Sequence, residues 1–253
     1  MEKLVCHGRI IRDISNYVCY KTMSSTLFFV FCKQIVNKIR VRFETDTDRL
    51  AIITPDRYTE ACDVMAKYFV PDEPLCISFG VTWCEEFHHQ AIDVLRKNLS
   101  LCLINKENDE IMGVRLTEVM KRSDPPFNPA EIPDQPIRDL LTFAHHKDSE
   151  FDVYDRIGSD EAMHFFTLAV HRKYRQLGIG SRLLRAAVAM CKEQGIKGIK
   201  GEGSSNFSQR IYEKEGFETI LTVSYEEYKL PSGRTIRETS GEHTCMKLYV
   251  MAL

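Results

Sequence analysis

The spacing of hydrophobic positions changes repeatedly between a strand period and a helix period, which predicts a mixed α/β (α+β) fold. Short segments with the apolar or alternating pattern of strands occur at residues 39–44, 50–53, 100–104, 111–117, 165–170, 196–202, 217–223 and 245–251. Helical spacing occurs at residues 58–69, 81–98, 136–146 and 181–194, and a short helix ends at Glu215. This order predicts an antiparallel first half and a β-α-β-α-β second half.

Two segments lack both periods. Residues 1–38 are basic and contain cysteines, so we expect residues 1–45 to form an N-terminal extension and residues 46–253 the folded domain. The extension is expected to be irregular or to add one short element, with a mitochondrial presequence as the alternative. Five of the nine prolines lie between Pro125 and Pro136, which predicts a surface loop or lid there.

Composition narrows the classes of partner. The chain of 253 residues is 43% hydrophobic and 28% charged, with a net charge of −2, so no basic field indicates nucleic acid. Its apolar runs are shorter than the roughly 18–20 residues of a membrane helix, so we expect no membrane partner. The nine cysteines form no Cys-x-x-Cys pair, which favours reduced thiols and a cytoplasmic location. We expect a monomer. The two His-His pairs lack a third ligand at a suitable spacing, so no metal is expected.

A basic turn with two glycines links the strand pattern at 165–170 to the helix pattern at 181–194. Its sequence is Arg175-Gln176-Leu177-Gly178-Ile179-Gly180-Ser181. Glycines allow a positive φ and a close approach of the backbone to a ligand, and the first amides of a helix bind anions. Leu183 replaces the third glycine of a dinucleotide-binding fingerprint, and the lysine of a P-loop is absent. The turn therefore predicts a pyrophosphate site of another kind.

Two further segments carry side chains that can act on protons. The stretch from Ser204 to Phe217 places Ser208 and Tyr212 four residues apart, on one face of a short helix. Its serines are equally suited to capping that helix, and Tyr212 to packing. The stretch Asp72-Glu73-Pro74-Leu75 sets two acids between prolines, a pattern that more often forms a solvated loop than a site.

These three segments together resemble a known superfamily. Arg175-x-x-Gly178-x-Gly180 resembles the Arg/Gln-x-x-Gly-x-Gly/Ala signature of the GNAT acyl-CoA-dependent N-acyltransferases, and residues 204–217 resemble its second block. Asp72-Glu73-Pro74-Leu75 resembles a segment of the insect arylalkylamine N-acyltransferases. The resemblance covers roughly residues 50–253 and implies a GNAT fold. Such a fold has a central, mostly antiparallel mixed sheet, flanked by helices, with a V-shaped splay between its central strands.

The resemblance also implies roles for individual residues. Acetyl-CoA or a longer acyl-CoA would be the co-substrate, bound by Leu168, Ala169, Val170, Arg175, Gln176, Leu177, Gly178, Ile179, Gly180, Ser181, Asn206 and Ser208. Glu73 would be the general base, and the catalytic hydroxyl would come from Ser204, Ser208 or Tyr212. Several insect members have an apolar residue at the position of Tyr212 and use serines, so the identity of the general acid stays open.

The expected reaction is direct transfer of an acyl group from acyl-CoA to a primary amine, in a ternary complex. An alkylammonium with a pKa near 10 must lose a proton before it attacks a thioester, and a carboxylate can attract this cation and relay its proton through water. The small-molecule acceptor is expected to be an arylalkylamine. The alternatives are a polyamine, agmatine-like or peptide amine, and a regulator that binds acyl-CoA without turnover.

Overall fold

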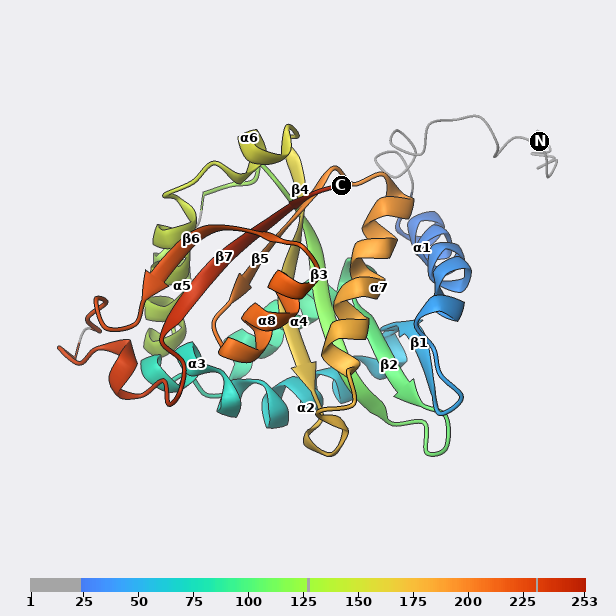
Figure 1. Cartoon of the computed structure of the whole chain (residues 1–253), viewed down its shortest axis with the longest axis horizontal. Helices are drawn as coiled ribbons and strands as arrows, with labels where there is room; N and C mark the ends of the chain where they lie inside the picture. The colour runs from blue at the N-terminus through green and yellow to red at the C-terminus, as the bar shows by residue number, and fades with distance from the viewer. Residues whose placement is uncertain (1–23, 127, 231) are drawn as a thin grey trace.

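The computed structural model describes residues 24–126, 128–230 and 232–253, and its centre is a seven-stranded sheet (Figure 1). The strands are β1 Asp48–Ile52, β2 Leu101–Asn105, β3 Ile111–Lys121, β4 Glu161–Val170, β5 Gly198–Gly203, β6 Glu218–Ser224 and β7 Cys245–Ala252. The helices are α1 Ser25–Ile39, α2 Tyr58–Tyr68, α3 Pro74–Phe79, α4 Glu85–Arg96, α5 Gln135–Asp148, α6 Val153–Ile157, α7 Ile179–Gln194 and α8 Asn206–Lys214. No described helix has the length and hydropathy needed to cross a membrane.

The sheet has the order β1-β2-β3-β4-β5-β7-β6. All neighbouring strands are antiparallel except β4 and β5, which are parallel and joined through α7. This arrangement confirms the predicted antiparallel first half and the alternation of strands and helices in the second half.

The sheet opens at its centre. Strands β4 and β5 pair only from Met163↔Ile199 to Phe165↔Gly201, although β4 continues to Val170. The pairing of β4 with β3 skips Phe166, so this residue forms a β-bulge where the two parallel strands separate. Among the described strands, none pairs with one edge of the end of β4, as the predicted GNAT fold requires.

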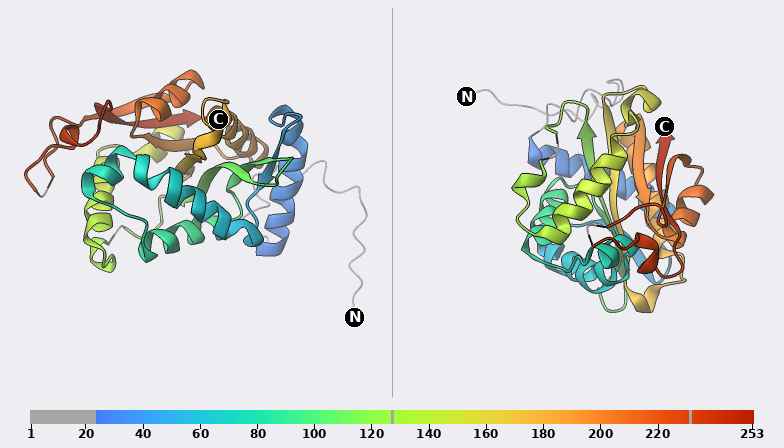
Figure 2. Two further views of the ribbon diagram at one scale, coloured as in Figure 1. Left: turned by 90° about the horizontal axis from the view of Figure 1, so that it is seen from below. Right: turned by 90° about the vertical axis from the view of Figure 1, so that its left-hand side faces the viewer.

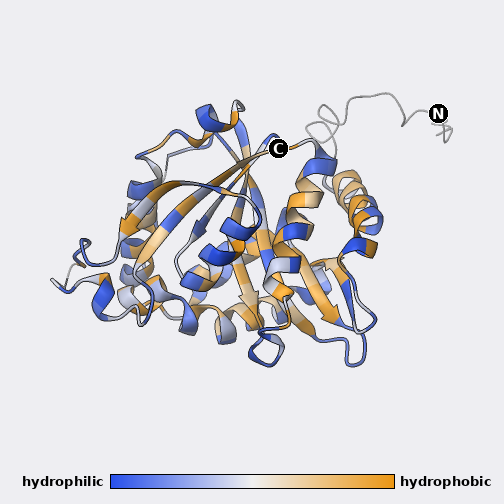
Figure 3. Ribbon diagram, in the orientation of Figure 1, coloured by the Kyte–Doolittle hydropathy of each residue, from blue (hydrophilic) through white to orange (hydrophobic). Residues whose placement is uncertain are grey.

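Helices cover both faces of the sheet (Figure 2). One core cluster joins α1 and α7 to the sheet, and a second joins α2, α4 and the start of α5 to the opposite face. Helix α7 presents its apolar side to the sheet and its polar side outwards (Figure 3). Gly195 ends this helix with φ 73°, which confirms the predicted glycine stop.

The N-terminal segment differs from the expectation. Residues 25–39, predicted to lack a period, form helix α1, and residues 39–44, predicted to be extended, contain the short 3-10 turn Arg40–Arg42. Ser24 caps α1, and Cys32, Ile35 and Val36 pack into the core beside α7. Packing against the core therefore stabilises a helix here, although the closely spaced phenylalanines give the sequence no clear helical period. The expectations for residues 1–23 lie outside the described residues.

Two short helices were missed, and the proline-rich loop was predicted correctly. The six-residue helix α3 and the five-residue helix α6 are too short to show a period. Between β3 and α5 the described residues contain a single 3-10 turn, Pro129–Glu131, which agrees with the loop predicted from the proline density. Whether this loop acts as a lid stays a prediction.

Candidate active site

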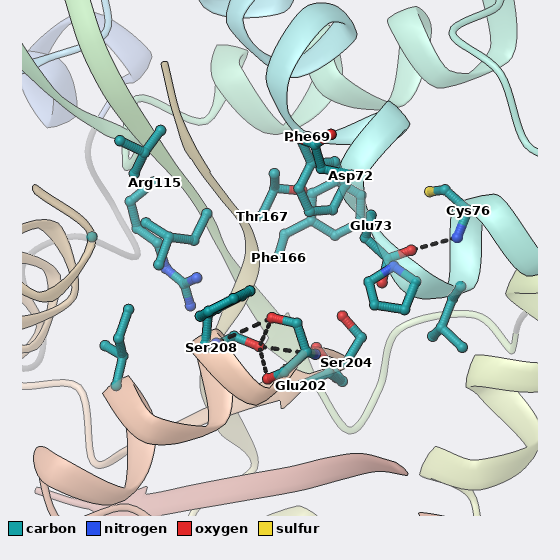
Figure 4. Close-up of a pocket in the computed structure, with 18 of the residues that line it drawn as sticks. Phe69, Asp72, Glu73, Cys76, Arg115, Phe166, Thr167, Glu202, Ser204 and Ser208 are labelled. Carbon is teal, nitrogen blue, oxygen red and sulfur yellow. Dashed lines mark hydrogen bonds between the residues drawn. The ribbon is translucent and has the colours of Figure 1, made fainter. Parts of the chain in front are cut away.

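A cavity of about 910 Å³ runs through the splay and is lined from both faces of the sheet (Figure 4). The structure places twelve of the predicted site residues on its walls: Glu73, Leu168, Val170, Arg175, Gln176, Gly178, Ile179, Gly180, Ser181, Ser204, Ser208 and Tyr212. Segments that are far apart in the sequence thus meet around one space. Three predicted residues do not line it. Ala169 faces the α2 core, Leu177 is exposed to solvent, and Asn206 bonds to another loop.

The glycine turn forms a cradle of backbone amides at the start of α7. Gly178 precedes the helix with φ 74°, and Gln176 also has a positive φ of 65°, so the chain reverses tightly before Ile179. A Cβ on Gly180 would lie 3.2 Å from the side chain of Ile211, so this position has little room for a larger residue. The unpaired amides of the first helical turn face the cavity wall and suit an anion.

Arg175 holds the turn in place rather than extending freely towards a ligand. Its guanidinium donates to the Tyr68 carbonyl at 2.8 Å and to Asp72 Oδ2 at 2.7 Å. Arg172 donates to the other oxygen of Asp72 at 2.8 Å. These arginines hold the pKa of Asp72 below its usual range although its partial burial opposes this. Asp72 therefore connects the segment after α2 to the glycine turn. Its negative charge is balanced by the two arginines.

Glu73 is a buried carboxylate with one unused oxygen. It caps α3, because its Oε2 accepts from the backbone amide of Cys76 at 2.5 Å, and Pro74 occupies the first helical position. The residue is 8% exposed, and Oε1 is buried without a hydrogen-bond partner among the described residues. Figure 4 shows Glu73 on the wall opposite α8. The cap fixes the carboxylate and leaves one oxygen to accept a proton.

The serines of the second block have different surroundings. Ser205 and Ser208 form a capping box at the start of α8, in which each side chain accepts from the backbone amide of the other. The Ser208 hydroxyl also donates to the Ser205 carbonyl at 2.9 Å, so it is fully engaged in the cap. No described residue forms a hydrogen bond with the Ser204 hydroxyl, while its carbonyl accepts from Tyr225 at 2.7 Å. Ser204 is therefore the more available serine.

Tyr212 lies at the point where the sheet opens. The residue is 1% exposed, stacks on Tyr249, and sets its ring against Gly201, where a Cβ would lie 2.4 Å from the hydroxyl. Its oxygen accepts from Arg115 Nη2 at 2.7 Å. Burial raises the pKa of Tyr212, and the neighbouring Arg115 partly opposes this shift. The phenol is therefore protonated at neutral pH. It lies beside the splay, where it can meet a bound substrate.

A charge network lies at the same opening, on the side of α4. His164 Nε2 lies 3.0 Å from Glu202 Oε2, and its Nδ1 lies 3.7 Å from Glu118 Oε1. Lys200 forms an ion pair with the other oxygen of Glu202 at 2.8 Å. Burial alone would lower the pKa of His164, but the carboxylates outweigh it and raise the pKa to about 9. Glu202 therefore lines the cavity as a carboxylate whose negative charge is balanced by His164 and Lys200.

The part of the cavity beyond Glu73 is mainly apolar. Its walls come from α4, α5 and the bulge in β4, and they consist of Phe87, Ile137, Leu140, Leu141, Ala144 and Phe166. Gln90 and His145 add polar groups at its border. This compartment fits a flat or branched apolar group attached to a cation near Glu73.

Comparison with known proteins agrees with this geometry. Residues 143–219 match the family model of the acetyltransferase (GNAT) domain. The chain carries a GNAT acetyltransferase domain. The match includes the bulged strand, the glycine turn and α8.

Solved structures extend the likeness of the GNAT fold to most of the chain. Arylalkylamine N-acetyltransferase 2 from Aedes aegypti has a TM-score of 0.76 at 19% identity, over 81% of this chain and 98% of that one. The mosquito arylalkylamine N-acetyltransferase like 5b has a TM-score of 0.75 at 23% identity, over 82% and 100%. The Drosophila melanogaster polyamine N-acetyltransferase has a TM-score of 0.71 at 15% identity, over 81% and 100%. At these identities the likeness concerns the fold.

Three residues of this site were not found from the sequence. Arg115, His164 and Glu202 line the cavity from β3, β4 and β5. The available signal was weak: Arg115 is the single charged residue of the predicted strand 111–117, whereas Glu202 shares its strand with two lysines and His164 precedes the predicted strand 165–170. Such a charge is costly to bury unless it has a partner, so its presence alone suggested a site without naming its chemistry.

Proposed function

We propose that the protein transfers an acetyl or longer acyl group from acyl-CoA to a primary arylalkylamine, without an acyl-enzyme. The observation that carries the proposal is Glu73. It is a fixed, buried carboxylate with a free oxygen, facing a cavity that reaches through the splay to the glycine turn. Base and cradle thus share one space, as direct transfer between two bound substrates requires.

The donor side suits the diphosphate and the extended arm of acyl-CoA. The amides after Gly178 would hold the pyrophosphate. The unpaired edge of β4 at Leu168 and Val170 would pair with the amides of the pantetheine arm, as an extra strand does. The thioester would then lie at the opening of the sheet, between Glu73 and α8.

The acceptor side supplies the base and excludes water. Glu73 would take a proton from the ammonium, and the neutral amine would attack the thioester carbonyl. The proton that the departing sulfur needs would come from Tyr212 or from Ser204. Ser208 is the least suited of the predicted hydroxyls, because its proton and its acceptor oxygen both serve the cap.

The charges of the cavity favour a monoamine over a polycation. Asp72, Glu73 and Glu202 are the carboxylates on its described walls. Asp72 is neutralised by two arginines, and Glu202 by His164 and Lys200. Glu73 is the one that remains for a substrate, so the cavity matches one cationic group and an apolar remainder. The polyamine, agmatine-like and peptide acceptors are therefore the second choice, and a regulator without turnover would have no use for a free buried base.

The experiment is thiol release from acetyl-CoA and from a long-chain acyl-CoA, measured with a panel of amines. We expect 2-phenylethylamine and tyramine to give the highest kcat/KM, above agmatine, spermidine and a peptide with a free N-terminus. A higher kcat/KM with the polycations would contradict the acceptor class. Binding of acyl-CoA without thiol release for any amine would contradict the enzyme activity.

A further inference from the structure

Arg115 is a buried cation without a carboxylate partner, and the roles proposed above leave it unused. It lies in the middle of β3, is 2% exposed, and has no Asp or Glu oxygen within 4.0 Å in the described part of the chain. Its Nε is buried without a hydrogen-bond partner. Burial of an unpaired guanidinium costs free energy, so a chain that retains one is expected to use the charge.

The position of Arg115 shows which charge it could meet. Its guanidinium carbon lies 4.2 Å from the centre of the Phe165 ring, and Phe165 is the last residue of β4 that pairs with β5. Its Nη2 donates to the Tyr212 oxygen at 2.7 Å, and that oxygen lies against Gly201, the partner of Phe165. Figure 4 shows Arg115 extending from β3 towards α8. The free cation thus lies at the opening of the sheet.

The other charges near this hydroxyl are already balanced. The charge of Glu202 raises the pKa of Tyr212 and that of Lys200 lowers it, and these two residues form an ion pair with each other. Burial raises the pKa of the Cys191 thiol on α7, and the charge of Arg115 partly opposes this shift. Arg115 is therefore the positive charge available to an anion that forms next to Tyr212.

We propose that Arg115 is a positioning residue that stabilises, through Tyr212, the negative charge that develops on the CoA sulfur as the thioester breaks. The proposal rests on the function proposed above and selects Tyr212 as the proton donor. Because Arg115 donates to the phenol oxygen, the phenol proton points away from Arg115 and towards the cavity. The cation then stabilises the phenolate after the proton has left.

The amine nitrogen forms a bond to the carbonyl carbon, the carbon–sulfur bond breaks, and sulfur keeps the electron pair and takes the phenol proton of Tyr212. The ammonium nitrogen loses two protons in total, the first to Glu73 before the attack. Water returns one of them to the Tyr212 phenolate and carries the other to solvent, so the enzyme is restored.

The first test needs no turnover. CoA is bound to the wild type and to Arg115→Met, and the thiolate absorption of bound CoA is followed against pH, with the desulfo-CoA complex subtracted. We expect the pKa of the bound thiol to be at least one unit higher in Arg115→Met, a tenfold change in its ionisation constant, and intermediate in Arg115→Lys. The matched control is Arg57→Met, since Arg57 also has a buried, unpartnered Nε but lies outside the cavity and pairs with Glu60.

The second test uses the reaction. We expect Arg115→Met and Tyr212→Phe each to lower kcat by 10- to 100-fold, and the double variant to be no slower than the slower single one, because Arg115 acts through Tyr212. Methionine removes an unpaired charge and keeps the volume, so the melting temperature should not fall.

An unchanged thiol pKa in Arg115→Met, or multiplicative effects on kcat in the double variant, would overturn the proposal. If the wild type releases no thiol with any amine, the proposed function fails. The thiol titration of bound CoA would still support or overturn the role of Arg115 in that case.

Discussion

Substitution of His164 by glutamine should reveal a pH-dependent contribution to stability that the wild type loses in alkali. The imidazole lies between two carboxylates, 3.0 Å from Glu202 and 3.7 Å from Glu118. Against the opposing effect of burial, these charges raise the pKa of His164 to about 9, from the usual value near 6.5. Glutamine removes the charge and keeps a similar size.

The size and sign follow from linkage. A difference of about 2.5 pKa units, at 1.36 kcal/mol per unit, gives roughly 3 kcal/mol. The folded state binds the proton more tightly than the unfolded state, so this stability is fully present below about pH 6.5. It is lost as the pH rises through about 9. We therefore expect His164→Gln to be less stable than the wild type by about 3 kcal/mol at pH 6, and the two to converge near pH 10.

Urea unfolding at several pH values from 6 to 10 measures this difference directly. Comparison of the two proteins at each pH cancels the titration of groups that they share. A difference in unfolding free energy that stays constant from pH 6 to 10 would refute the reasoning. It would mean that folding does not raise the pKa of His164.

Two further predictions concern the cradle and the serines. Valine at Gly178 must adopt a φ of 74°, so Gly178→Val should weaken acyl-CoA binding at least tenfold by calorimetry, whereas Gly158→Val, with φ 67° outside the cavity, should carry similar strain and retain affinity. Equal affinities in the two variants would contradict the position of the pyrophosphate. Ser208→Ala should lower the unfolding free energy by about 1 kcal/mol with little change in kcat, since its hydroxyl serves the cap. A large loss of kcat with unchanged stability would make Ser208 catalytic, and Ser204→Ala is the matched comparison.

The sequence predicts most of the sheet and the donor side of the site. Clear turns bound the strand patterns, and the local backbone of the turn requires Gly178 and Gly180. The strands and the glycine turn can therefore be predicted without knowledge of tertiary contacts. Helix α1 was missed because its buried residues pack against α7, a contact that the local sequence does not show. The helix that Glu73 caps was missed although Pro74 at its first position was a usable signal.

The sequence could not reveal the pairing of charges. Asp72 and Glu73 are neighbours, yet one is neutralised by arginines a hundred residues away, and the other keeps a free oxygen. Likewise, nothing local shows that Arg115 and Tyr212, 97 residues apart, share a hydrogen bond. Such differences arise only when the strands are brought together, so the roles of the acids and hydroxyls require the structure.

The pH dependence of Glu73→Gln tests the central claim most directly. Glutamine still accepts from the Cys76 amide and keeps the cap, but it cannot take a proton. With 2-phenylethylamine at pH 7 we predict a 10²- to 10³-fold loss of kcat/KM, with unchanged affinity for acyl-CoA. The loss should shrink as the pH approaches the pKa of the amine near 10, where the neutral amine no longer needs a base. A variant within twofold of the wild type at pH 7, or a loss that stays constant up to pH 10, would contradict the account of Glu73 as the base.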